Sequence, residues 1–209
     1  MCNFQSTCHI CQSKRLHKFL SLGPIPLANS FLPPDQLGVT EPYYPLDVCF
    51  CGNCGLVQLA QVIAPEILFK DYAYLTGTSE PMKAHFANLA ASAIQRFSLT
   101  EGDLVLDIGS NDGTLLENFQ KHGMRVVGVE PATNVAKLAS SRGVETWDDF
   151  FNESLARRIC SEQGVTPGQS WLQMFWHMWL TWRAFSAASI IYWRMTAFLS
   201  LKFPTWWIC

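Results

Sequence analysis

The fold of this chain is decided by the stretch Val105-Leu106-Asp107-Ile108-Gly109-Ser110-Asn111-Asp112-Gly113-Thr114-Leu115-Leu116. This pattern predicts an apolar strand that runs into Asp107, a glycine-containing turn, and an amphipathic helix that begins near Gly113. A second apolar strand follows at 125–129 and ends at Glu130. The order is typical of an α/β fold with a parallel sheet, which binds nucleotides or nucleosides at the carboxyl ends of its strands.

The turn between the first strand and its helix indicates the ligand. Dinucleotide-binding proteins use G-x-G-x-x-G, with a pyrophosphate on the helix N-terminus. Here the turn reads G-S-N-D-G, and the carboxylate of Asp112 stands where phosphate would bind. A carboxylate repels an anion and suits a cation, which favours S-adenosylmethionine, a nucleoside with an ammonium and a sulfonium group. Glu130 can accept both ribose hydroxyls. The alternative is an ordinary strand–helix–strand unit with a glycine turn.

Two C-x-x-C motifs, Cys8–Cys11 and Cys51–Cys54, form the second pattern, and they are separated by residues 12–50. Two thiolates three positions apart can bind one metal ion, and two such motifs complete a tetrahedral four-cysteine site. Four protein ligands leave no open position, so we expect a structural Zn²⁺. We expect Cys49 to point away from the metal, with a ligand exchange as the alternative.

Two other interpretations of the cysteines are four reduced thiols without metal and two disulfides in a secreted protein. The first residues are mostly polar and show no signal-peptide pattern. A reducing cytoplasmic setting favours zinc, and we expect the protein to be cytoplasmic. A zinc module can also bind nucleic acid, but Lys plus Arg total 15 against 17 Asp plus Glu, without a basic stripe for phosphates. We therefore expect no nucleic-acid partner.

An ordered series of motifs resembles the sugar C-methyltransferases of deoxysugar biosynthesis, from about residue 8 to about residue 165. The resemblance implies an N-terminal zinc-binding domain, a Rossmann-like domain that binds S-adenosylmethionine, and a C-terminal domain. It also implies methyl transfer to C3 of a nucleotide-linked 4-keto deoxysugar, through an enolate. The motifs are Cys8-x-x-Cys11, Leu22-Gly23-x-x-Pro26-Leu27-Ala28-Asn29-Ser30-Phe31, Tyr44-Pro45-Leu46, Cys51-x-x-Cys54-Gly55-Leu56-Val57-Gln58-Leu59, Asp71-Tyr72-x-Tyr74-x-x-Gly77-x-Ser79 and Asp107-Ile108-Gly109-Ser110-Asn111-Asp112-Gly113.

The same resemblance assigns roles to individual residues. It implies that Tyr72 and Tyr74 form a wall of the sugar pocket, where a phenol can bond the ketone oxygen; a packed aromatic pair is the alternative. It places Asp149 and Phe150 beside the adenine, although Asp149 could instead cap the next helix. His85 is interpreted as a helix-surface residue, and the family's general base lies beyond Cys209. The expected cofactor-binding residues are Asp107, Gly109, Ser110, Asn111, Asp112, Gly113, Glu130, Pro131, Asp149 and Phe150.

The chain is expected to divide into three parts. Residues 1–75 form the zinc-binding domain from short strands and loops, and residues 76–168 form an incomplete methyltransferase domain. Pro65 to Arg96 should be largely helical. Residues 102–165 supply two to three strand–helix units, whereas complete domains typically have about 100–150 residues. The third part, residues 169–209, does not fit the fold.

The composition of residues 169–209 differs from that of the rest of the chain. Seven of the eight tryptophans lie between Trp171 and Trp207, and no acidic residue follows Glu162. A membrane span is disfavoured, since polar residues interrupt 163–182 and later cations break up the rest. We expect no membrane partner. An aromatic partner surface is a further alternative.

The codons of this segment support another hypothesis, because Trp and Met each have a single codon. A frame shifted by one base permits V-A-N-V-L-A-H-V-A-D-L-E-G-F for residues 171–185, a strand end followed by an amphipathic helix. It permits L-E-D-D-G-V-F-V-I-E-V-P-Y-L-V-D-M for residues 192–209, which resembles the same family. We therefore expect residues 169–209 to be an out-of-frame, non-native tail.

Without the base and the C-terminal domain, we expect this chain to be inactive by itself. We expect the intact protein to be monomeric and to act on a small nucleotide sugar. The alternatives are a non-catalytic module that binds zinc and S-adenosylmethionine, and a methyltransferase for another small ketone.

The gene sequence tests the frame hypothesis directly. We expect the coding DNA near codon 169 to continue as an uninterrupted methyltransferase sequence in the neighbouring frame. Sequencing across this point decides the matter, and stop codons in that frame would contradict the hypothesis.

Overall fold

The computed structural model describes residues 2–164 and 170–174, and these fall into two compact units. The division lies between Leu68 and Phe69, earlier in the chain than the boundary at residue 75 expected from the sequence. The segment that carries Tyr72 and Tyr74 therefore belongs to the second unit. Most of the expected tail, residues 175–209, lies outside the described residues.

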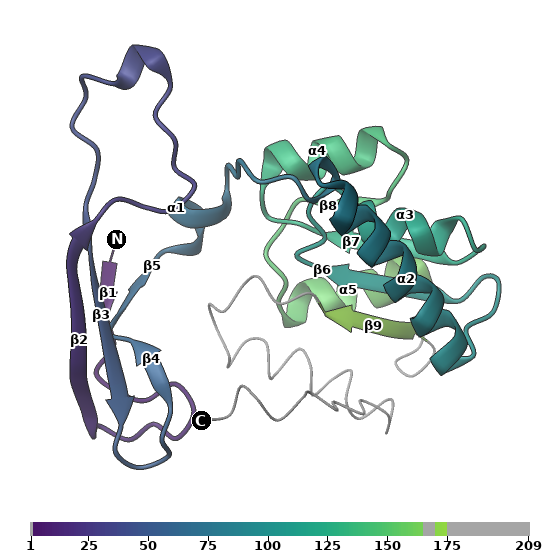
Figure 1. The fold of residues 1–209 in the computed structure, drawn as a ribbon. Coiled ribbons are helices and arrows are strands. Elements are labelled where there is room, and N and C mark those ends of the chain that lie inside the picture. The colour runs from purple at the N-terminus through teal and green to yellow at the C-terminus, as the bar shows by residue number, and fades with distance from the viewer. Residues whose placement is uncertain (1, 165–169, 175–209) are drawn as a thin grey trace. The chain divides into compact units, whose positions relative to one another are not determined.

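The first unit is built from short antiparallel strands, as predicted (Figure 1). β1 pairs with β5, and β2, β3 and β4 form a three-stranded sheet in that order. Its elements are β1 (Cys2–Phe4), β2 (Leu16–Ile25), the 3-10 helix η1 (Pro34–Gln36), β3 (Tyr44–Cys51), β4 (Val57–Leu59) and β5 (Gln61–Ile63).

Strand β3 is the centre of this sheet and carries the second cysteine motif at its end. Asp47, Cys49 and Cys51 alternate with more exposed residues, so the three share one buried face of the strand. β2 begins at Leu16, shortly after the first motif, and Leu16 pairs with Cys51. This pairing brings the two cysteine motifs to one end of the sheet.

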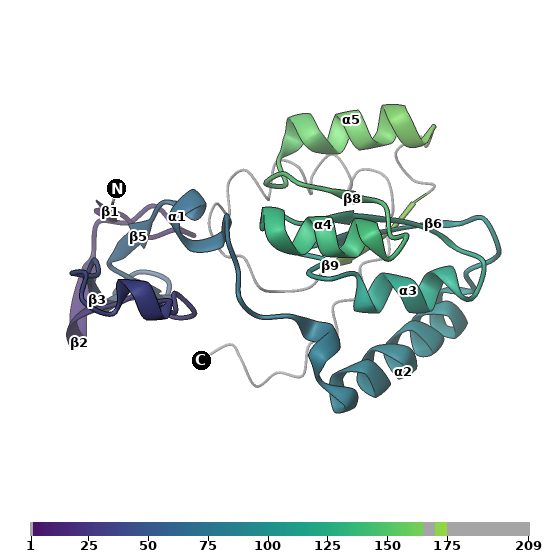
Figure 2. The same ribbon diagram turned by 90° about the horizontal axis from the view of Figure 1, so that it is seen from above.

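The second unit contains a parallel sheet with the strand order β8-β7-β6-β9 (Figures 1 and 2). Asp103 leads into β6, which is parallel to both β7 and β9, and Val105 pairs with Val126 of β7. The elements are α1 (Pro65–Phe69, which spans the division), the 3-10 helix η2 (Thr76–Thr78), α2 (Glu80–Phe97), β6 (Leu104–Ile108), α3 (Thr114–Gln120), β7 (Arg125–Val129), α4 (Thr133–Ser141), β8 (Thr146–Trp147), α5 (Glu153–Gln163) and β9 (Ser170–Met174).

Helices cover both faces of this sheet, which explains why its two central strands are almost wholly apolar. Val105 and Val126 face α2 and α3, and pack with Phe86 and Phe119. Leu106, its neighbour in β6, faces the other side and packs with residues of α5. Figure 2 shows α5 on one side of the sheet and α2 with α3 on the other. The predicted strand–turn–helix order and the α/β fold are confirmed.

The segment from Pro65 to Arg96 differs from its prediction as one largely helical stretch. α1 ends at Phe69 and α2 begins at Glu80, with only the short η2 between them. Polar contacts of the connecting residues replace helical hydrogen bonds here, as described below.

The tail hypothesis concerns the gene and stays a prediction. Within the expected tail, residues 170–174 form β9, which pairs in parallel with β6. Residues 169 and 175–209 of this tail lie outside the described residues. Among the described residues, no helix is long and apolar enough to span a membrane. The alternative of a span within 163–182 lies mostly outside them.

Gly113 provides a test of the turn that leads into α3. Its φ is +78°, and a Cβ atom there would lie 3.0 Å from Cγ2 of Val144. We expect Gly113→Ala to lower the free energy of unfolding by about 2–4 kcal/mol, from left-handed strain and from overpacking. Gly102→Ala is the matched control, because Gly102 has φ +87° but nothing within 4 Å. Urea unfolding measures both, and equal losses would contradict the contact with Val144.

Candidate functional site

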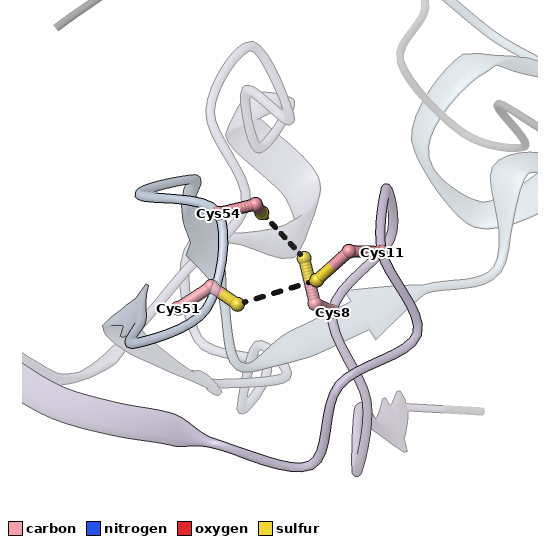
Figure 3. Close-up of side chains that lie close together, drawn as sticks. All are labelled: Cys8, Cys11, Cys51 and Cys54. Atoms are coloured by element: carbon pink, nitrogen blue, oxygen red, sulfur yellow. Dashed lines mark hydrogen bonds between the residues drawn. The ribbon is translucent and has the colours of Figure 1, made fainter.

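The four cysteines of the C-x-x-C motifs converge at one point in the first unit, as predicted (Figure 3). Their sulfur atoms all lie within 4.8 Å of one another. The Sγ atoms of Cys8 and Cys54 are 3.5 Å apart, and those of Cys11 and Cys51 are 3.6 Å apart. A tetrahedral zinc ion with Zn–S bonds of about 2.3 Å requires S–S separations of about 3.8 Å. A disulfide needs about 2.0 Å, and all four are free thiols.

Tight turns aim these sulfurs inward. The N–H of Gln12 donates to the carbonyl of Cys8 at 3.0 Å, and the N–H of Gly55 donates to that of Cys51 at 2.9 Å. Both Gln12 and Gly55 have positive φ, so each motif closes a turn that a continuing strand could not make. The local backbone therefore presents two thiols from each motif to a common centre.

The electrostatics of the cluster fit a cation. A hydrogen bond from Asn53 and one from the backbone of Ser13 lower the pKa of Cys11 to about 6. The backbone N–H of Leu56 acts to lower the pKa of Cys54, but desolvation and the neighbouring thiols outweigh it and raise that pKa to about 12. Several thiols so close together cannot all ionise without a counter-charge, which a bound Zn²⁺ supplies.

Gln58 of β4 holds the first motif in place. The N–H of His9 donates to Gln58 Oε1 at 2.9 Å, and Gln58 Nε2 donates to the carbonyl of Thr7 at 3.4 Å. The side chain is buried and so links the first motif to β4. Cys49 shares the buried face of Cys51, since residues two apart in a strand lie on one face. It is not one of the four clustered thiols, in agreement with the prediction that it does not bind the metal.

A second candidate site is a cavity in the second unit, at the carboxyl ends of the parallel strands. It has an acidic side formed by Asp107 and Glu130 and an aromatic side formed by α1, α2 and the segment between them. The lining residues are Phe69, Tyr72, Tyr74, Thr76, Met82, Phe86, Asp107, Gly109, Ser110, Asn111, Thr114, Leu115 and Glu130.

Asp107 is a buried acid that lacks a partner at one oxygen. Its Oδ1 and the hydroxyl of Ser110 are buried and have no hydrogen-bond partner among the described residues. Burial, followed by the charge of Glu130, raises the pKa of Asp107 to about 8. Unpaired buried polar atoms are costly, so these two atoms mark where a ligand with hydrogen-bond donors would be stabilised.

Glu130 is buried as well, but its carboxylate is bound by the backbone. The N–H of Asn111 donates to Oε2 and that of Ala132 donates to Oε1, each at 2.9 Å. Burial raises the pKa of Glu130 in spite of these two bonds. A carboxylate has about four acceptor positions, so Glu130 keeps capacity for further donors.

Asp112 does not have the role that its position in the turn predicts. It is fully buried, and Oδ2 forms an ion pair with Arg142 Nη1 at 3.1 Å. Its Oδ1 accepts a hydrogen bond from Thr114 Oγ1 at 2.6 Å, and the N–H of Gly77 donates to Oδ2 at 2.8 Å. Asp112 is therefore not among the residues that line the cavity, whereas Asp107 and Glu130 are.

The structure brings together some of the other predicted residues and leaves others apart. Gly109, Ser110 and Asn111 line the cavity with both tyrosines, whereas Gly113, Pro131, Asp149 and Phe150 are not in its lining. Asp149 does not cap α5 either. That cap is Asn152, whose side chain accepts from the N–H of Leu155 at 2.9 Å. His85 is exposed on α2, in agreement with its interpretation as a surface residue.

Several lining residues were missed from the sequence. Phe69, Met82 and Phe86 belong to helices that precede the sheet, and their spacing there predicts only a packed helix face. Thr76 has no motif of its own. The segment with Tyr72 and Tyr74 could have indicated these residues, because it joins the end of α1 to the start of α2 and so brings both helix ends to the cavity.

Comparison with known proteins shows what the chain is similar to. Residues 8–69 match a family described as "Putative zinc binding domain". The chain is similar to the C-methyltransferase NovU of Streptomyces niveus, with 36% identity over 171 residues, or 82% of this chain and 41% of NovU. The chain thus spans less than half the length of this curated relative. These matches confirm the predicted resemblance to the C-methyltransferases.

Several solved structures are similar to parts of the chain. An RNA methyltransferase from Salinibacter ruber in complex with S-adenosyl-L-homocysteine is 21% identical, with a TM-score of 0.28, over 49% of this chain and 80% of that one. A SAM-dependent methyltransferase from Geobacter sulfurreducens is 20% identical, with a TM-score of 0.27, and the match covers 54% of this chain and 36% of that one. A mycobacterial quinone oxidoreductase is 18% identical, with a TM-score of 0.35, and the match covers 65% of this chain and 42% of that one.

The Gln58 contacts predict a role in metal retention. We expect Gln58→Ala to weaken zinc binding by roughly 10-fold to 100-fold, as is typical when a partner outside the ligand set is lost. Gln36→Ala, at an exposed position of η1, is the control. Competition with a chromogenic chelator measures the affinity, and equal zinc retention in the two variants would contradict this role.

Proposed function

We propose that this chain, which carries the zinc-binding domain of the C-methyltransferases, also carries the S-adenosylmethionine site of such an enzyme. The substrate class that we propose is a nucleotide-linked 4-keto deoxysugar, methylated at C3. The observation that carries the proposal is the buried, unpartnered carboxylate oxygen of Asp107 at the strand ends, beside Glu130. The 36% identity to NovU, a C-methyltransferase, supports it.

The cavity fits the cofactor by the chemistry of its two acids. The ammonium group of S-adenosylmethionine can donate to Asp107 Oδ1, which lacks a partner, and the nearby Ser110 hydroxyl can join the same group of bonds. The free acceptor positions of Glu130 suit the two ribose hydroxyls. Gly109, at φ +74°, keeps side-chain atoms away from the turn that lines the cavity.

The chemistry on the sugar side needs positioning more than covalent participation. The ketone at C4 acidifies the proton on C3, and its removal leaves an enolate whose carbon attacks a methyl group in line. S-adenosylmethionine supplies that electrophilic methyl group when bound. Tyr72 and Tyr74 both line the cavity, and a phenol there can donate to the ketone oxygen and stabilise the enolate. The general base is not assigned to a described residue.

The zinc ion has a structural role in this proposal. Four cysteines complete its coordination, so it holds the first unit together and does not take part in methyl transfer. Thiols kept reduced for zinc also fit a cytoplasmic protein.

Cofactor binding should be linked to a proton. The pKa of Asp107 is about 8 in the free protein, and a neighbouring ammonium stabilises the carboxylate and lowers that pKa. Between the two pKa values, binding releases a proton, so affinity rises with pH. We expect about a tenfold increase per pH unit between about pH 6 and about pH 7.5. Calorimetry with S-adenosylmethionine in buffers of different ionisation enthalpy measures both the affinity and the released proton.

Two variants sharpen this experiment. Asp107→Asn should lose the pH dependence and weaken binding by roughly 10-fold to 100-fold, the effect of one charge-assisted hydrogen bond. Asp35→Asn, at an exposed position of η1, should bind like the unaltered chain. Affinity independent of pH, with no proton released, would show that Asp107 does not bind the cation. Absence of binding would refute the cofactor site itself.

A further inference from the structure

Residues 70–79, here called the tyrosine strap, connect α1 to α2 and carry Tyr72 and Tyr74. None of these ten residues, all of which the structure describes, is buried. The burial of apolar side chains therefore does not hold the strap in place, as it would hold a core strand or helix. Something else must fix the two tyrosines at the cavity.

One anchor is Asn134, in the first turn of α4. Its Oδ1 accepts a hydrogen bond from the N–H of Tyr72 at 3.1 Å, and its Nδ2 donates to the carbonyl of Tyr72 at 2.8 Å. The side-chain amide thus bonds both backbone groups of one residue, as a neighbouring strand would. The N–H of Thr133 donates to the carbonyl of Lys70 at 3.2 Å. The first turn of α4 therefore holds the first part of the strap.

The other anchor is the turn after β6. Asn111 Nδ2 donates to the carbonyl of Tyr74 at 3.0 Å, and the N–H of Thr76 donates to Asn111 Oδ1 at 2.9 Å. The next residue, Gly77, donates to the buried carboxylate of Asp112 at 2.8 Å. The strap is therefore fixed from Tyr74 to Gly77 by the same turn that lines the cavity.

Gly77 fits this anchor because it has no side chain. A Cβ atom there would lie 2.7 Å from both Asp112 Oδ2 and Thr114 Oγ1. Those two residues are buried and bonded to each other, so they cannot move aside easily. Any larger residue at position 77 must lift the strap.

We propose that Asn134, Asn111 and Asp112 are positioning residues that hold the tyrosine strap across the carboxyl ends of β6 and β7. The same two places in the chain also bind Glu130, through the N–H groups of Asn111 in the turn after β6 and of Ala132 at the N-cap of α4. A ligand on Glu130 therefore stabilises both anchors, and filling the cavity tightens the strap. The attachment of the strap is inferred from these contacts alone. The assignment of Tyr72 and Tyr74 to the sugar-binding side of the cavity rests on the proposed function.

Amide hydrogen exchange of the full chain, resolved by residue, tests the attachment without a ligand. In Asn134→Ala the Tyr72 amide should exchange roughly 5-fold to 10-fold faster, as expected for one net hydrogen bond. Asn134→Asp keeps the acceptor and should retain the protection of that amide. Asn118→Ala is the control, because the amide of Asn118 donates to the carbonyl of Thr114 instead of the strap.

Gly77→Ala examines the second anchor by steric contact. The amides at positions 76 and 77 should exchange faster, while those of Leu106 and Val127 in the sheet keep their rates, which a general loss of stability would change. Gly38→Ala, with nothing within 4 Å of the added atom, is its control. Unchanged exchange of Tyr72 in Asn134→Ala, or an equal increase in Asn118→Ala, would overturn the proposal.

S-adenosyl-L-homocysteine serves as the probe for the link to the cavity. With binding established by calorimetry, saturating probe should slow exchange at positions 72 and 76 by at least roughly threefold, a fraction of one hydrogen bond. Bound probe without slowing would overturn the link to the cavity. Failure of the probe to bind would refute the proposed function, while the unliganded comparison still decides whether the three residues hold the strap.

Discussion

Two carboxylates buried at the ends of adjacent parallel strands are the constraint around which the second unit is built. Asp107 lies in β6 and Glu130 directly follows β7, and the pairing of Ile108 with Val129 sets them side by side at one edge of the sheet. Burial there costs free energy unless donors compensate the charge. The loops after both strands turn their N–H groups toward Glu130. The turn after β6 and the first turn of α4 hold the tyrosine strap.

Three neighbouring acids are compensated in three different ways, and the differences separate structure from function. Asp112 is paired with Arg142 and serves the turn. Glu130 is bound by two backbone N–H groups and keeps free acceptor positions. Asp107 retains an oxygen without a partner among the described residues, and burial together with the charge of Glu130 raises its pKa. Only the acids whose bonding is incomplete face the cavity, so incomplete bonding is the physical mark of the ligand side.

The amide side chains Gln58, Asn111 and Asn134 perform a related task in the two units. Each one bonds both an N–H and a carbonyl of an irregular segment. In the first unit this holds a cysteine motif, and in the second it holds the strap. Short irregular segments that bury little apolar area are thus given a defined position by one or two side chains.

The sequence by itself determined the features that depend on neighbours along the chain. The apolar run of β6, the glycine turn and α3 follow from local pattern, and the two C-x-x-C motifs predict four converging thiols because each motif closes a tight turn. Only the tertiary structure decided what each polar side chain contacts. Asp112 was expected to meet a ligand, but Arg142 and Gly77, both distant in sequence, neutralise and enclose it. The interruption between α1 and α2 was likewise decided by contacts between segments, which periodicity and turn signals do not encode. The cap of α5 is instead a local contact between Asn152 and Leu155.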